Sequence, residues 1–201
     1  ASSSAETGEL HFKADSISST TDTVFRIYYN GTTTGDYATN ATYGAENVWT
    51  NDYVAVLHLE EDANNDVDGY KDSTANSFDG TGVSMSLAST SDRISGGTTE
   101  FDGADDYIGL DSSIDLANLP GLTVSAWSKY DSSGSAEHSL ISNWKNSKST
   151  EPLFLLRLEP SNGTVENFVY SGGDVNNNLS GVSVRPNEWD HVVLRLDSVG
   201  D

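Results

Sequence analysis

The sequence predicts an all-β fold, a sandwich of two antiparallel sheets that follows a small N-terminal β-extension. Three observations support this prediction: short apolar runs rich in β-branched and aromatic residues, turn residues between those runs, and almost no helical periodicity. The 201 residues include 18 glycines and many serines and threonines. Such a composition favours short strands joined by turns over long helices.

The predicted strands are spaced along most of the chain. Residues 53–59 are apolar on both faces, as a central buried strand is, and Val192, Leu194 and Leu196 share one face of the last strand. Residues 31–52 are expected to form a long loop or linker, and only residues 112–119 have a pattern compatible with a short helix. In chain order, strands are predicted at residues 24–29, 53–59, 99–101, 106–110, 122–127, 138–144, 153–158, 165–170 and 191–196.

The charge balance excludes several partners. The chain has 31 acidic and 10 basic residues, for a formal net charge of −21. A surface of that sign repels phosphate backbones and anionic lipid headgroups, so we expect neither nucleic-acid nor membrane-surface binding. No stretch approaches the roughly 20 apolar residues that span a bilayer, so membrane insertion is not expected either. With no cysteine, disulfides and cysteine chemistry are excluded, although secretion is not.

Five motifs follow one another along the chain: residues 58–61 (HLEE), 71–80 (KDSTANSFDG), 101–108 (FDGADDYI), 122–127 (LTVSAW) and 188–193 (EWDHVV). In this order they resemble the laminin-G-like (concanavalin A-like) jelly roll, over roughly residues 53–201. A shorter match rests on residues 8–10, 23–30 and 48–49. Through it, residues 9–49 resemble the end of a domain of unknown function that often precedes this module in prokaryotic surface proteins.

The resemblance implies both a domain division and a function. Residues 1–50 would be a partial N-terminal β-segment, and residues 51–201 the jelly roll. The implied function is a non-enzymatic, extracellular recognition or adhesion module at a cell surface that binds carbohydrate. The alternative is a structural subunit of an extracellular filament, surface layer or appendage, whose partners are copies of itself. The first predicts a cleft with an exposed aromatic side chain, and the second predicts large apolar contacts between copies.

The resemblance ends before the final strands that a complete jelly roll has. We therefore expect the chain to be incomplete as a folding unit, because missing strands leave unpaired backbone groups at sheet edges. Either the rest of a longer chain supplies the strands, or a neighbouring molecule adds them by β-augmentation, with residues 8–30 as donor or acceptor. The remaining alternative is a sandwich that closes within the 201 residues on shorter strands.

One acidic loop has the spacing of a calcium site. Oxygen-bearing side chains occupy its positions 1, 3, 5 and 9, and Gly69 stands at position 6, where a sharp turn is needed. Position 12 holds Ala75 instead of the expected bidentate glutamate, so an ordinary Asn/Asp-rich hairpin loop is the alternative. The predicted Ca²⁺ ligands are Asn64, Asp66, Asp68 and Asp72, and a second, weaker candidate set is Asp102, Asp105 and Asp106.

The remaining polar motifs favour binding over catalysis. No alternating Glu-x-Asp-x-Glu run of the glucanase type occurs, and the four histidines lack metal-ligand spacing. Sugar sites combine an aromatic platform with amide hydrogen-bonding groups. The predicted set is Trp144, Tyr130, Tyr170, Asn143 and Asn146, near a further polar loop at residues 176–178; all three aromatics could instead be packing. Trp127, on an alternating apolar strand, is expected in the core.

Overall fold

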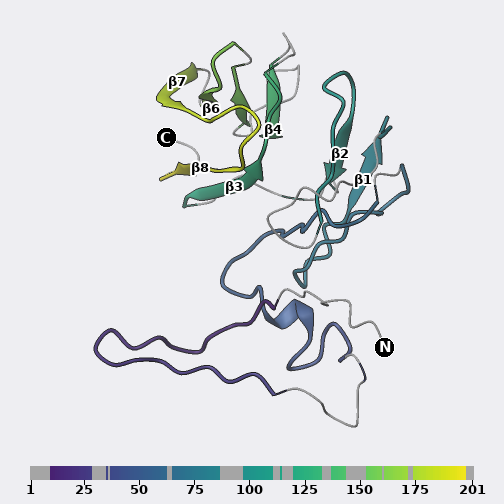
Figure 1. The fold of residues 1–201 in the computed structure, drawn as a ribbon, viewed down its shortest axis with the longest axis vertical. Coiled ribbons are helices and arrows are strands. Elements are labelled where there is room, and N and C mark those ends of the chain that lie inside the picture. Colours follow the sequence, from purple (N-terminus) through teal and green to yellow (C-terminus); the bar gives the residue numbers. More distant parts are fainter. Residues whose placement is uncertain are drawn as a thin grey trace, which may run out of the picture. The chain divides into compact units, whose positions relative to one another are not determined.

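A computed structural model shows the chain as two compact units, Ala1–Ile114 and Asp115–Asp201. The predicted boundary after residue 50 lies inside the first unit. All strand pairs in the described residues are antiparallel and one short 3₁₀ helix accompanies them, which confirms the all-β class (Figure 1). The structure describes residues 10–28, 35, 37–62, 65–86, 97–110, 114, 120–132, 137–143, 153–159, 161–171 and 174–197.

The described residues of the first unit form little regular structure. Its described elements are the 3₁₀ helix η1 (Ala45–Asn47) and the strands β1 (Gly80–Val83) and β2 (Tyr107–Leu110). The two strands pair from Gly80 opposite Leu110 to Val83 opposite Tyr107. A Cβ atom at Gly80 would lie 2.5 Å from a methyl group of the Ile108 side chain on β2, so a larger residue there would force Ile108 to move.

Three of the strands predicted in this unit do not form in its described residues. Residues 24–28 and 99–101 form no strand, and residues 53–59 make only an isolated bridge between Leu57 and Asp72. Their apolar, β-branched composition gives strand propensity, but a strand also needs a neighbour to accept its hydrogen bonds. Val24 and Ile27 are consequently exposed instead of buried.

The second unit consists of two antiparallel sheets. The first pairs two strands far apart in the sequence, with Leu122 opposite Leu196 and Ser128 opposite Asp190. The second is a meander of four consecutive strands. The first sheet holds β3 (Leu122–Ser128) and β8 (Asp190–Leu196), and the second holds β4 (His138–Ser142), β5 (Leu153–Leu158), β6 (Thr164–Ser171) and β7 (Asp174–Ser183).

One apolar core joins the two sheets. Alternate residues of β5, namely Phe154, Leu156 and Leu158, are buried against Val192 and Leu194 of β8 in a single cluster. Burying each such side chain contributes about 1.5–3 kcal/mol relative to leaving it in water. Two sheets that share a core in this way are consistent with the predicted β-sandwich.

Two features of the second unit differ from the prediction. Trp127 is 54% exposed, so its expected place in the core is wrong. The strand alternation turns Val124 inward and Trp127 outward, where its ring stacks on His191 at a centroid distance of 5.0 Å. The polar residues 176–178, expected in a loop, lie within β7 and pair with β6.

The short helix predicted at residues 112–119 falls, apart from Ile114, outside the described residues. Within the described part of the chain, no helix has the length and apolar character needed to cross a membrane.

Candidate functional site

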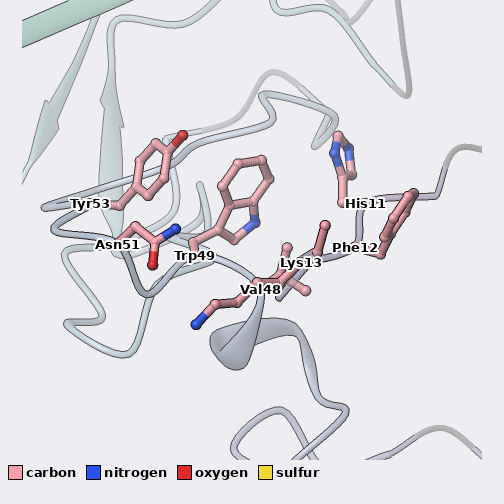
Figure 2. Close-up of a pocket in the computed structure, with 8 residues that line it drawn as sticks. His11, Phe12, Lys13, Val48, Trp49, Asn51 and Tyr53 are labelled. Atoms are coloured by element: carbon pink, nitrogen blue, oxygen red, sulfur yellow. The ribbon is translucent and has the colours of Figure 1, made fainter. Parts of the chain in front are cut away.

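The first unit contains a pocket of about 220 Å³ between two segments that are distant in the sequence. One wall comes from residues 11–14 and the other from Val48, Trp49, Asn51 and Tyr53. The rings of Tyr53, Trp49 and His11 stand in a row along it (Figure 2). Trp49 lies 5.4 Å from His11 and 5.3 Å from Tyr53, centroid to centroid, with the Tyr53 ring edge-on.

Hydrogen bonds fix both ends of the wall that contains Trp49 and Tyr53. Helix η1 ends at Asn47, whose side-chain amide donates to the carbonyl of Ala41 at 2.7 Å, so Val48 and Trp49 leave the helix in a defined direction. At the other end, the side-chain amide of Asn76 donates to the carbonyl oxygens of Tyr53 and Val54. Both ends of the wall are therefore fixed by side chains that do not themselves line the pocket.

Lys13 ties the two walls together. Its ammonium group donates a hydrogen bond to the hydroxyl of Thr50, which lies between two residues of the opposite wall. The neighbouring Phe12 ring contacts Phe25 at 4.8 Å, and this contact supports the segment from behind.

The pocket also brings two histidines together. The rings of His11 and His58 lie 4.7 Å apart, and both contact Trp49. Their sequence spacing gave no sign of this, because residues 10–14 join the site only through tertiary structure. The one local signal was the pattern Trp49-x-Asn51-x-Tyr53, two aromatics around an amide in a polar segment.

Aromatic faces beside amide and ammonium donors can bind a sugar. The apolar face of a pyranose ring stacks on an aromatic ring, and its hydroxyls accept and donate hydrogen bonds at the rim. Tyr53 is 49% exposed and Trp49 is partly exposed, and both line the pocket.

The predicted sugar residues of the second unit are arranged differently. Tyr130 is 6% exposed and belongs to the core cluster, so its ring is not free to stack on a ligand. The Asn143 side-chain oxygen accepts a hydrogen bond from the backbone N–H of Phe154 and thereby extends the β4–β5 pairing. Tyr170 pairs with Val175 through the β6 and β7 backbones, while Trp144 and Asn146 lie outside the described residues.

In the predicted calcium loop, Asp72 has a structural role. Its two carboxylate oxygens accept four hydrogen bonds, from the backbone N–H groups of Val56, Thr74 and Phe78 and from the Thr74 hydroxyl, all at 2.8–3.0 Å. A carboxylate offers about four lone-pair positions, so this set fills it. These four hydrogen bonds join the Asp72 carboxylate to three backbone positions and so stabilise the loop.

The other predicted ligands of this loop do not gather around Asp72. Asp66 and Asp68 are exposed, and the backbone N–H of Asp68 donates to the Thr81 hydroxyl. Asn64 lies outside the described residues. The described part of this loop therefore forms a turn before β1 without assembling three carboxylates.

The structure does assemble the second candidate set. Carboxylate oxygens of Asp102, Asp105 and Asp106 lie within 4.8 Å of one another, the one such group of His, Cys, Asp or Glu side chains in the described residues. The loop closes because the backbone N–H of Asp102 donates to Asp106 and that of Ala104 donates to Asp102. The Oδ1 atom of Asp106 is buried and has no hydrogen-bond partner among the described residues.

The ion pair between Lys71 and Asp79 shifts the pKa of both residues in the 71–80 motif. The hydrogen bond to Asp79 raises the pKa of Lys71. Burial alone would raise the pKa of Asp79, but hydrogen bonds from Lys71 and from the Asp72 backbone outweigh it and lower that pKa. These charges stabilise the loop and lie outside the aromatic pocket.

One family model matches about half of the chain. Residues 102–200 match a laminin G family model described as the concanavalin A-like lectin/glucanases superfamily. The predicted resemblance is confirmed over this range, which includes the acidic loop and every strand of the second unit; the preceding domain of unknown function is not shown. No curated protein and no solved structure matched the chain. The family supports a lectin-like or other binding module in general.

Proposed function

We propose that the chain is a non-enzymatic, extracellular recognition or adhesion module that binds glycans. The observation that supports it best is the row of rings formed by Tyr53, Trp49 and His11 beside Asn51. The family match in residues 102–200 points to the same general class of function. The pocket lies outside the matched range, so the two observations are independent.

A glycan array tests this proposal. The protein should bind a subset of glycans, and Trp49→Ala should weaken that binding about tenfold or more, because stacking on the central ring is lost. Trp127→Ala is the matched control, since this exposed tryptophan lies in the other unit. Absence of binding to any glycan would contradict the proposal.

The same array separates the pocket from the predicted site around Trp144. If Trp144→Ala removes binding and Trp49→Ala does not, the glycan site lies in the second unit. Tyr170→Ala and Asn146→Ala should then follow Trp144→Ala.

We further propose that Ca²⁺ binds at Asp102, Asp105 and Asp106. Calcium prefers hard oxygen ligands, and the buried, unpartnered Oδ1 atom of Asp106 lacks the compensation that buried polar atoms normally have. A cation beside it would remove that cost and the repulsion between the three carboxylates.

Thermal melting in EDTA and in millimolar Ca²⁺ tests the calcium proposal. Binding to the native state alone contributes about 2.7 kcal/mol at a hundredfold excess over Kd. Asp106→Asn should abolish the calcium-dependent rise in Tm, whereas Asp66→Asn should retain it. If the two variants behave the other way round, the ion binds in the loop first predicted from the sequence; identical midpoints in the parent would contradict both sites.

A second candidate function, a self-associating structural subunit, is favoured by residues 10–28, here called the arm. The arm runs out and doubles back without strand pairing (Figure 1), and hydrogen bonds to Ser18 and Thr23 hold its tip. The arm has no net charge, whereas the whole chain has a formal net charge of −21. Its exposed apolar side chains are Leu10, Phe12, Ile17, Val24, Phe25, Ile27 and Tyr28.

Sedimentation and electron microscopy over a range of concentrations test this alternative. Assembly through the arm predicts oligomers or filaments that Ile17→Asp and Ile27→Asp disrupt. Val67→Asp is the control, because Val67 is an exposed apolar residue outside the arm. A protein that stays monomeric at high concentration would contradict it.

A further inference from the structure

We infer that the aromatic pocket selects sugars that carry a carboxylate, such as uronic acids; this rests on the proposal that the pocket binds glycans. The inference comes from the charge of the pocket, which is opposite to that of the chain as a whole. Of the described residues that line it, Lys13 is cationic and none is acidic. The whole chain carries 31 acidic residues against 10 basic ones.

The lysine is held where a ligand can use it. Its ammonium group has three N–H donors, and the Thr50 hydroxyl accepts one of them. This bond fixes the side chain at the wall that also carries Trp49, so little further ordering is needed when a ligand binds. Because Lys13 lines the same pocket as the rings, a carboxylate on a bound sugar can accept a hydrogen bond from one of the remaining donors.

Two histidine rings accompany the lysine. His11 lines the pocket, and the centroid of the His58 ring lies 4.7 Å from that of His11. Asp15 and Asp52 lie next to the lining segments in the sequence, but neither lines the pocket. A carboxylate in the pocket therefore meets hydrogen-bond donors and no like charge among the described lining residues.

The negative charge of the chain acts at longer range. At about 0.1 M salt the Debye length is about 10 Å, so distant carboxylates are largely screened while a direct ammonium–carboxylate contact is not. The selectivity should therefore be measured near 0.15 M salt, where the local contact outweighs the general repulsion.

Matched oligosaccharide pairs test the inference. Oligosaccharides of hyaluronan, alginate and polygalacturonate are each compared with their carboxyl-reduced, neutral forms by titration, with the pocket tryptophan fluorescence as a second readout. We expect an acidic form to bind about fivefold more tightly than its neutral partner. Lys13→Gln should bring the ratio of acidic to neutral affinity to about one, whatever it does to the affinity for the neutral form, and Lys13→Arg should keep the preference.

Lys71→Gln is the matched control. It makes the same change in net charge at a lysine that pairs with Asp79 outside the pocket, and it should keep the preference for the acidic form. Equal binding of acidic and neutral forms, or a preference that survives Lys13→Gln, overturns the inference while sugar binding itself stands. If no pair and no array glycan binds, both the inference and the proposed glycan function fail.

Discussion

The two units of this chain are stabilised by different kinds of interaction. Among the described residues, the first unit buries two large apolar side chains, Tyr70 and Met85, whereas the second buries eight in one cluster. The first unit is instead stabilised largely by hydrogen bonds between side chains and the backbone. Asp72 accepts four hydrogen bonds, and Asn65 both donates to and accepts from the backbone of Met85.

This difference shows where each unit is vulnerable. An apolar core is sensitive to cavities and largely insensitive to single charges. A loop held by one carboxylate is sensitive to removal of that group, because the donors around it lose their partner together. The proposed binding sites follow the same division, since the aromatic pocket and the acidic cluster both lie in the unit that buries fewer of the described apolar side chains.

The largest expected effect is in the second unit. Leu156→Ala should lower the free energy of unfolding by about 2–5 kcal/mol, because Leu156 is 1% exposed and its removal leaves a cavity between the sheets. Urea denaturation measures the change. Leu155→Ala, on the other face of the same strand, is the control and should cost less; equal costs would mean that the two faces of β5 are not distinguished by burial.

The next effect is in the first unit. Asp72→Asn should cost about 1–3 kcal/mol, because the amide places N–H groups where the carboxylate accepted hydrogen bonds. Amide hydrogen exchange at Val56 and Phe78 should accelerate, while that of β6 should not. Asp68→Asn, at an exposed aspartate, is the control and should change neither measurement. Unchanged exchange at Val56 would contradict the role given to Asp72.

A smaller effect is expected at Trp127. Trp127→Ala should cost only about 1 kcal/mol, because it removes an exposed ring stacked on His191 and leaves no cavity. Trp127→Phe should retain most of the stacking. If Trp127→Ala instead lowers the free energy of unfolding by several kcal/mol, the Trp127 side chain is part of the core and this assignment is wrong.

The smallest effect is a pH dependence at β8. The backbone N–H of Arg185, and then its guanidinium group, hold the pKa of Asp190 below its ordinary value of 3.8. A lowered folded-state pKa stabilises the protein above about pH 4, and this contribution is lost as the pH falls through the folded-state pKa. Urea denaturation between pH 3 and 6 should show a weaker acid dependence in Asp190→Asn. Arg185→Ala should keep most of it, because the backbone donor remains; loss of the dependence in that variant would contradict this order of causes.

The sequence predicted the second unit well because its strands alternate apolar and polar residues in the pattern that a shared core requires. The strand expected at residues 153–158 matches β5, and those at 122–127 and 191–196 differ from β3 and β8 by one residue. β7 was missed because its asparagine-rich sequence resembles a loop, and it becomes a strand through pairing with β6. In the first unit the strand predicted at residues 106–110 differs from β2 by one residue, but the three others failed, since propensity alone supplies no pairing partner.

The sequence by itself determined the all-β class, the family resemblance in residues 102–200, the acidic character and the acidic triplet at Asp102, Asp105 and Asp106. These properties depend on local pattern and composition. Tertiary structure alone decided three features. Trp127 faces outward, the Asp72 carboxylate accepts hydrogen bonds from three backbone N–H groups and one hydroxyl, and the His11 ring contacts those of Trp49 and His58. Each of these depends on which distant segment packs alongside, and local pattern does not specify that choice.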